Sequence, residues 1–355
     1  MENLSPDLIN EVLLLLPVKS LLRFRSICKS FYSLIDSHDF IYSHLHTCSK
    51  KRLHRKLICH KNYKNRTYIH ALDIDNDSFE EVPLDFELQF RYSFFVASCN
   101  GLHLLITSDT IISVLNPSTR NYRELPAFPV NSPQTIYFGY QYLGFGYDST
   151  TDDYKVLRII CTKFCYQVWI LELRSSRWRR IQNFPYIKYT NFQRANFRNC
   201  FLDGYVYILC YENGKGSHII MAFDVAKETF SVVPEPIYQT QGKRILLDVF
   251  EGCLSFTVQT PSVVDLYLRK KEGVVFTWTK LFSLSKLFCP KFLGYSKEGD
   301  NVLVSCLGYL YSYDLIERSL ERIKTSLIEK LCERDLFDFR VLYGESLVSI
   351  NSLKR

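Results

Sequence analysis

Apolar side chains in residues 4–45 recur at helical spacing, and this pattern predicts three short helices. Ser5 can cap the first helix, and Pro17 ends it after about three turns. Ser20 can cap the second helix. The third runs through Phe31 and Ile35.

These helices carry more apolar surface than so short a segment can bury by itself. On the first, apolar side chains spread over nearly half of the circumference. A module of this size is too small to be stable alone, so we expect a partner to complete it. The alternative is an ordinary helical subdomain that caps its own neighbour. The residues expected to contact the partner are Leu4, Pro6, Leu8, Ile9, Val12, Leu13, Leu16, Pro17, Val18, Leu21 and Leu22.

A second pattern fills the remainder of the chain, where strand-like apolar runs alternate with turn residues. Six segments align on one bulky apolar position, and five of them carry Asp, Asn or Glu six positions earlier. A short polar side chain before a tight turn and an aromatic after it are typical of two strands joined by that turn. The aligned residues are Phe79, Tyr122, Trp178, Phe230, Trp278 and Leu320.

Glycine-centred runs lie between these hairpins and indicate a second hairpin in each repeat. They include residues 99–102, 202–205, 250–253 and 343–345, and the repeats are 42 to 56 residues apart. Two hairpins make about four strands per repeat, and the period is close to the kelch period of about 50 residues. Because ring closure removes exposed edges, an all-β propeller of six or seven blades is predicted. The alternative, a two-sheet sandwich, does not account for the period.

Basic residues are concentrated where the two patterns meet. The net charge is +7, and residues 51–66 hold seven Lys or Arg with no acidic residue. A nucleic-acid-binding protein would spread basic residues over the face that contacts the nucleic acid, so a nucleic acid is not expected as a partner. The sequence divides into a helical module at residues 1–46, a basic linker and first strand at residues 47–66, and a propeller at residues 67–355. We expect the basic residues to form a solvated edge at the junction between the module and the propeller. The alternative is a nuclear import signal at residues 50–56.

The composition favours a protein of the cytoplasm, the nucleus or both. Acidic Glu2, Asp7 and Glu11 stand where a signal peptide would be basic, and no apolar run approaches the roughly 18 residues of a membrane span. The twelve cysteines are therefore expected to be reduced thiols. The pair Cys161 and Cys165 lacks a second pair or a nearby His, so no metal or cofactor is expected.

The helical module resembles an F-box, in the form found in the large plant group whose F-box is followed by an F-box-associated domain. Residues 16–25, read as Leu-Pro-Val-Lys-Ser-Leu-Leu-Arg-Phe-Arg, carry the resemblance with residues 29–35 and 40–45. Residues 98–102, 115–120 and 144–156 are similar to motifs of the associated domain. The resemblance implies a kelch-like propeller and an F-box that docks on a Skp-type adaptor, which in turn binds a cullin scaffold.

This resemblance implies a non-catalytic substrate receptor of a ubiquitin ligase, in which the propeller holds a target protein. No glycine-rich phosphate loop, HExxH motif or nucleophile elbow occurs, so no catalytic residue is expected. The competing hypothesis is a free propeller that binds a glycan or a metabolite, with the helical module serving only to dimerise.

Residues 183–199 form the best candidate for a target-binding loop. Tyr, Phe and Arg are enriched at interface hot spots, and this stretch combines them with no acidic residue. A basic loop selects an acidic partner segment. The residues expected to contact the target are Tyr186, Lys188, Tyr189, Arg194 and Arg198.

Overall fold

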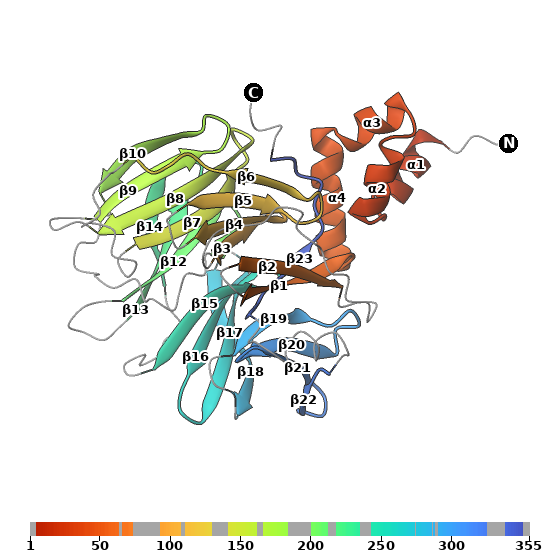
Figure 1. Ribbon diagram of the computed structural model, residues 1–355. Coiled ribbons are helices and arrows are strands. Elements are labelled where there is room, and N and C mark those ends of the chain that lie inside the picture. The colour runs from red at the N-terminus through yellow and green to blue at the C-terminus, as the bar shows by residue number, and fades with distance from the viewer. Residues whose placement is uncertain are drawn as a thin grey trace.

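The computed structural model describes residues 5–63, 66–73, 93–107, 111–129, 141–161, 166–183, 200–211, 218–234, 243–273, 275–285, 287, 290–324 and 338–350. It consists of a small helical module that packs against a ring of β-sheets (Figure 1).

Four helices make up the helical module: α1 (Pro6–Leu13), α2 (Val18–Phe24), α3 (Lys29–Ile35) and α4 (His38–Lys51). Ser5 caps α1 as predicted, because its hydroxyl accepts a hydrogen bond from the Leu8 amide at 3.2 Å. The prediction for Ser20 is wrong, since α2 begins two residues earlier, immediately after Pro17. Proline at that position fixes an extended backbone just before the helix and provides no side-chain cap.

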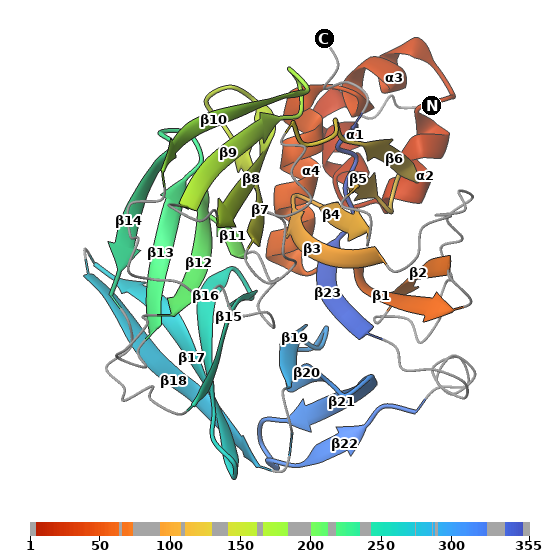
Figure 2. The same ribbon diagram turned by 60° about the vertical axis from the view of Figure 1, so that its left-hand side comes forward.

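The described residues of the second part form six sheets, which confirms the predicted propeller and sets its blade number at six. Figure 2 shows the blades arranged around the ring. The first two blades are β3 (Ser93–Cys99), β4 (Leu102–Thr107), β5 (Ile112–Asn116) and β6 (Asn121–Glu124), then β7 (Gln141–Asp148), β8 (Asp153–Cys161), β9 (Tyr166–Glu172) and β10 (Arg177–Asn183). The next two are β11 (Cys200–Leu202), β12 (Tyr205–Tyr211), β13 (His218–Asp224) and β14 (Thr229–Val233), then β15 (Arg244–Phe250), β16 (Cys253–Gln259), β17 (Val263–Glu272) and β18 (Val275–Ser285). The fifth is β19 (Lys291–Tyr295), β20 (Asn301–Cys306), β21 (Tyr309–Asp314) and β22 (Leu320–Arg322). The sixth contains β1 (Arg55–Tyr63), β2 (Arg66–Asp73) and β23 (Asp338–Gly344).

The aligned hairpins join the third and fourth strands of the blades. The side-chain oxygen of Asn116 accepts a hydrogen bond from the Ser118 amide at 2.9 Å, and Asp224 and Asp314 cap the equivalent turns in the same way. The aromatic after the turn joins neighbouring blades. The Trp178 indole donates to the Pro126 carbonyl at 2.9 Å, and the Trp278 indole donates to the Pro234 carbonyl at the same distance. The first aligned residue, Phe79, lies outside the described residues.

The glycine-centred hairpins join the first and second strands in three blades. Asn100–Gly101, Asp203–Gly204 and Glu251–Gly252 all have positive φ at both residues, which a type I′ turn requires. The prediction of a fourth such hairpin, at residues 343–345, is wrong. Gly344 ends β23, and the chain continues out of the sheet instead of turning back.

The last strand closes the ring by pairing with the first. β23 is antiparallel to β1, with Gly344 opposite Arg55, so the sixth blade is built from both ends of the chain. The following residues, 345–350, which we call the C-terminal segment, then pass between the helices and the first blade. Leu347 packs into the core of the helical module, and Ile350 packs into the core of the first blades. The Asn116 amide fixes the segment by donating to the Ser346 and Val348 carbonyls at 3.0 and 2.8 Å.

The junction between the two parts is not the solvated edge expected from the sequence. Arg55 is buried, and both it and Arg52 pair with Glu251 of the fourth blade. Lys56 pairs with Glu345 at 2.9 Å. The propeller supplies acidic partners that are distant in sequence. The boundary expected after residue 46 falls inside α4, which continues to Lys51.

Replacing Gly101 with Ala should destabilise the protein more than replacing Gly204. Both glycines have φ near +80° in equivalent turns, so each substitution carries a similar backbone cost of about 1 kcal/mol. A methyl group at Gly101 would also overlap the Ser346 side chain, whereas at Gly204 no heavy atom lies within 4 Å. We expect an additional loss of about 1–3 kcal/mol, measured as a lower melting temperature. Equal losses would contradict the packing of the C-terminal segment on this turn.

Candidate functional site

Large apolar side chains are exposed on the helical module. Leu8 and Val12 are 50% and 57% exposed, and their four-residue spacing places them on one face of α1. Leu15, in the turn after α1, is 42% exposed. Ile27, which lies between α2 and α3, and Tyr32, which lies on α3, are also exposed. Exposed apolar side chains that cluster in so small a module indicate a protein-binding surface. We call Leu8, Val12 and Leu15 the α1 surface.

The structure divides the residues expected to contact a partner into three groups. Pro6, Leu8 and Val12 are exposed, whereas Ile9, Leu16, Pro17 and Leu22 are half-buried. Leu13, Val18 and Leu21 are buried with Ile35, Phe40 and Leu347, where they form the core that supports the surface. Leu4 lies outside the described residues.

Three exposed residues were missed by the sequence analysis. Leu15 lies three residues after Val12 and seven after Leu8, so helical spacing was a usable signal for it. No comparable signal identified Ile27 and Tyr32, because a short apolar run does not show which of its side chains are buried in the core.

Helix α4 docks the module on the propeller at both of its ends. Near its N-terminus, His38 lies 3.1 Å from Asp152 in the turn between β7 and β8. At its C-terminus, Arg52 pairs with Glu251 at 3.1 Å and stacks over the Tyr295 ring. With a rise of about 1.5 Å per residue, this 14-residue helix extends over about 21 Å across one face of the ring.

A cluster of tyrosines fills the contact below α4. The Tyr42 ring lies 5.2 Å from that of Tyr147, and its hydroxyl lies 3.5 Å from the hydroxyl of Tyr154. Burial raises the pKa of all three phenols, so they remain neutral hydrogen-bonding groups. Burial also acts to raise the pKa of Asp152, but hydrogen bonds from Tyr147 and Arg174 outweigh it and keep the carboxylate charged.

The C-terminal segment caps a helix of the module. Val18, the first residue of α2, donates its amide to the Glu345 carboxylate at 2.8 Å. The other carboxylate oxygen pairs with Lys56, and Glu345 is only 4% exposed. A negative charge at a helix N-terminus is stabilising, and no neighbouring side chain caps α2. The propeller therefore supplies a contact that the module itself lacks.

His44 connects α4 to the turn between α1 and α2. It is fully buried, and its Nε2 lies 2.8 Å from the Leu16 carbonyl oxygen. Burial lowers the pKa of His44, which favours a neutral ring that donates its Nε2 proton to this carbonyl. The α1 surface is thus held in place by α4, and through α4 by the propeller.

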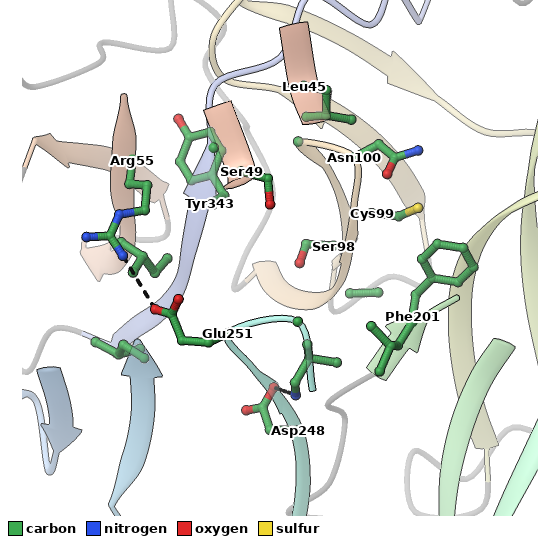
Figure 3. Close-up of a pocket in the computed structure, with 18 of the residues that line it drawn as sticks. Leu45, Ser49, Arg55, Ser98, Cys99, Asn100, Phe201, Asp248, Glu251 and Tyr343 are labelled. Atoms are coloured by element: carbon green, nitrogen blue, oxygen red, sulfur yellow. Dashed lines mark hydrogen bonds and ion pairs between the residues drawn. The ribbon is translucent and has the colours of Figure 1, made fainter. Parts of the chain in front are cut away.

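A cavity of about 730 Å³ lies where α4 crosses the ring. It is lined by the inner strands β3, β11, β15, β19 and β23 and by the C-terminal half of α4 (Figure 3). This site has no counterpart in the sequence analysis, because its walls come from segments that are far apart in the chain.

The expected target-binding residues Tyr186, Lys188, Tyr189, Arg194 and Arg198 lie outside the described residues. The strands on either side of them are described, and β10 ends at Asn183 while β11 begins at Cys200. The other end of β11 leads into the turn at Asp203, which lines the cavity under α4. The five expected residues therefore precede β11, whereas the turn that lines the cavity follows it.

The described part of the chain offers neither a metal site nor a membrane-spanning helix. No group of three or more His, Cys, Asp or Glu is placed there to hold a metal ion. Among the same residues, none of the helices combines the length and apolar character needed to cross a membrane.

Replacing Glu345 with Ala should loosen the helical module. The substitution removes the cap of α2 and leaves Lys56 without this carboxylate, and losing one partner of a buried charged contact costs about 3–5 kcal/mol. We expect faster hydrogen exchange at the α2 amides, including Val18. The matched control is Glu317→Ala, which removes an exposed carboxylate of the fifth blade. Unchanged exchange in α2 would show that the contact with Glu345 does not stabilise the module.

Both parts of the chain match known protein families. Residues 1–43 match the model of the F-box domain, and residues 49–339 match that of the F-box associated beta propeller domain. The F-box protein CPR1 of Arabidopsis thaliana is 30% identical over 334 residues, which cover 86% of this chain and 80% of that protein. An F-box/kelch-repeat protein of the same plant is 26% identical over 308 residues, with 80% of each covered.

A solved structure agrees on the fold. TolB from Acinetobacter baumannii superposes with a TM-score of 0.51 at 10% sequence identity, over 87% of this chain and 73% of that one. At this level of identity the similarity concerns the propeller fold alone. Together with the matches to both domains, the exposed α1 surface and the six-bladed ring identify this chain as a member of the family of F-box proteins that carry an F-box associated β-propeller domain.

Proposed function

We propose that this protein is the substrate-recognition subunit of a Skp–cullin–F-box ubiquitin ligase. The observation that carries the proposal is the exposed α1 surface on an F-box that is firmly docked to a propeller. The F-box would bind a Skp-type adaptor, which connects it to the cullin, and the propeller would bind the target protein.

In this function the protein contributes position and no chemistry of its own. Tethering a target near the charged ubiquitin carrier raises the effective concentration of its lysines around the thioester. This effect depends on a fixed geometry. The contacts of α4 at both ends and the contact between Glu345 and Val18 support such rigidity.

The target is proposed to be a protein with an acidic segment, bound by the basic and aromatic residues of the loop after β10. Tyr186, Lys188, Tyr189, Arg194 and Arg198 are the candidates. The combination of Tyr, Lys and Arg without an acidic residue in residues 183–199 supports this choice, because aromatic and arginine side chains are enriched at interface hot spots.

We propose that the protein acts in the cytoplasm, the nucleus or both. The hypothesis of a nuclear import signal at residues 50–56 is disfavoured, because such a signal must be accessible and Arg52, Arg55 and Lys56 are engaged in ion pairs with the propeller. The alternative function is a free propeller that binds a glycan or a metabolite, with the helical module serving only to dimerise. The match of residues 1–43 to the F-box domain favours adaptor binding over this alternative.

Replacing both Leu8 and Val12 with Ala should abolish adaptor binding without unfolding the protein. Both side chains are at least half exposed, so their truncation removes partner contacts and leaves the core intact. We expect the affinity for a Skp-type adaptor to fall at least about tenfold, measured by calorimetry and co-purification. Ile316→Ala, which truncates an 82% exposed side chain on the fifth blade, is the control. Adaptor binding at the wild-type level by the double variant would rule out this surface.

Replacing Lys188, Arg194 and Arg198 together with Glu should prevent target ubiquitination while adaptor binding persists. Charge reversal repels an acidic segment and slows its approach. The readout is turnover of the target in cells, together with co-purification of the adaptor. The control reverses three exposed lysines elsewhere on the propeller, Lys270, Lys271 and Lys297. Normal turnover of the target by the first variant would move the binding site elsewhere.

A further inference from the structure

The cavity under α4 has the features of a small-molecule site. Its volume of about 730 Å³ is within the range of about 300–1,000 Å³ that is typical of ligand pockets. One side is closed by α4, which contributes Leu45 and Ser49 to the lining. Since α4 is fixed by contacts at both ends, its side of the lining is held in place.

The walls of the cavity differ in chemistry. Figure 3 shows Arg55 and Glu251 on one side, with Phe201 and Cys99 on the other. Lys291 and Asp248 extend the charged wall, and Val249 and Phe95 add to the apolar lining. A ligand that fits both walls has a charged head and an apolar body.

The charged wall favours a negative head. The lining contains four basic side chains, Lys50, Arg52, Arg55 and Lys291, and three acidic ones, Asp203, Asp248 and Glu251, so the cavity has a net charge of +1. The pairs Arg55–Glu251 and Lys291–Asp248 are each separated by 3.5 Å. A lysine ammonium carries three N–H donors and an arginine guanidinium carries five, which is more than one carboxylate engages.

Irregularities in the inner strands occur at the cavity. The register of β3 shifts between Phe95 and Ala97, and that of β19 shifts between Phe292 and Gly294. In each strand the extra residue, Val96 or Leu293, lines the cavity. Bulges of this kind are frequent beside binding sites, because they redirect side chains and interrupt strand pairing.

We infer that this cavity binds a small organic monoanion with an apolar body. The carboxylate, or an equivalent anionic group, would lie beside Lys291 and Arg55, and the body would lie against Phe201 and Val249. The inference does not depend on the proposed ligase function. It concerns a site inside the ring, whose lining does not include Leu8, Val12 or Leu15 of the α1 surface.

The test uses the purified full-length chain and three probes of one shape: hydrocinnamate, hydrocinnamamide and phenylpropylamine. They share a phenyl body and carry an anionic, a neutral and a cationic head. We expect hydrocinnamate to bind at one site with a Kd on the order of 1 mM, measured by calorimetry, and to raise the melting temperature with dose. The amide should bind at least about tenfold more weakly, and the amine should not bind.

Two variants of one ion pair should change the affinity in opposite directions. Lys291→Met removes the cation and should weaken hydrocinnamate binding about tenfold, whereas Asp248→Asn removes the competing carboxylate and should strengthen it. Each variant breaks the same pair, so a loss of stability alone would affect both in the same direction. Lys271→Met, which changes an exposed lysine in β17, should leave the affinity unchanged.

Three results would overturn the inference. The first is no binding of hydrocinnamate at about 10 mM, roughly ten times the expected Kd. The second is equal or tighter binding of the amine, which would reverse the assigned charge. The third is an affinity that Lys291→Met and Asp248→Asn alter in the same direction, which would place the anionic head elsewhere.

Discussion

The antiparallel pairing of β23 with β1 is the interaction on which the rest of this structure depends. Each blade buries its faces only against its neighbours, so an open ring would leave two blade faces and their edges exposed. The pairing of Arg55 with Gly344 closes the ring, and it also places Glu345 and Leu347 directly beside the F-box. Closure of the propeller and completion of the F-box core are therefore achieved by adjacent residues.

The F-box and the residues that complete it lie near opposite ends of the chain. The F-box is synthesised first, yet the cap of α2 and part of its core come from residues near the opposite end, so both remain incomplete until the last strand has paired. Joining such distant residues has an entropic cost that grows slowly with chain length. The buried ion pair between Lys56 and Glu345 and the contacts of Leu347 oppose this cost, and they connect the F-box to the propeller.

Features that depend on neighbouring residues could be predicted from the sequence, whereas contacts between distant residues could not. The hairpins could be predicted because Asn116 and Asp224 cap turns a few residues away, and because Gly101 meets a backbone requirement of its own turn. The docking of the F-box could not, since Arg52 and Glu251 are far apart in sequence and the basic segment alone resembles a solvated one. Periodicity identified an apolar helix in α1, but it did not show that Leu13 faces the core while Leu8 and Val12 face solvent, because both sides of that helix are apolar. The cavity depends on five inner strands and was beyond any local pattern.

Helix α4 has two roles that are physically connected. It holds the F-box through His44 and the carbonyl of Leu16, and it covers the cavity through Leu45 and Ser49. A ligand in the cavity would contact α4 and the propeller together, so it would bind the docked arrangement better than any arrangement in which α4 has moved away. By mass action, such a ligand would stabilise the docked state by a free energy that grows with the logarithm of its concentration relative to its Kd. The position of the α1 surface relative to the propeller would then be set by the same helix that lines the cavity, because α4 is the one helix of the described chain that does so.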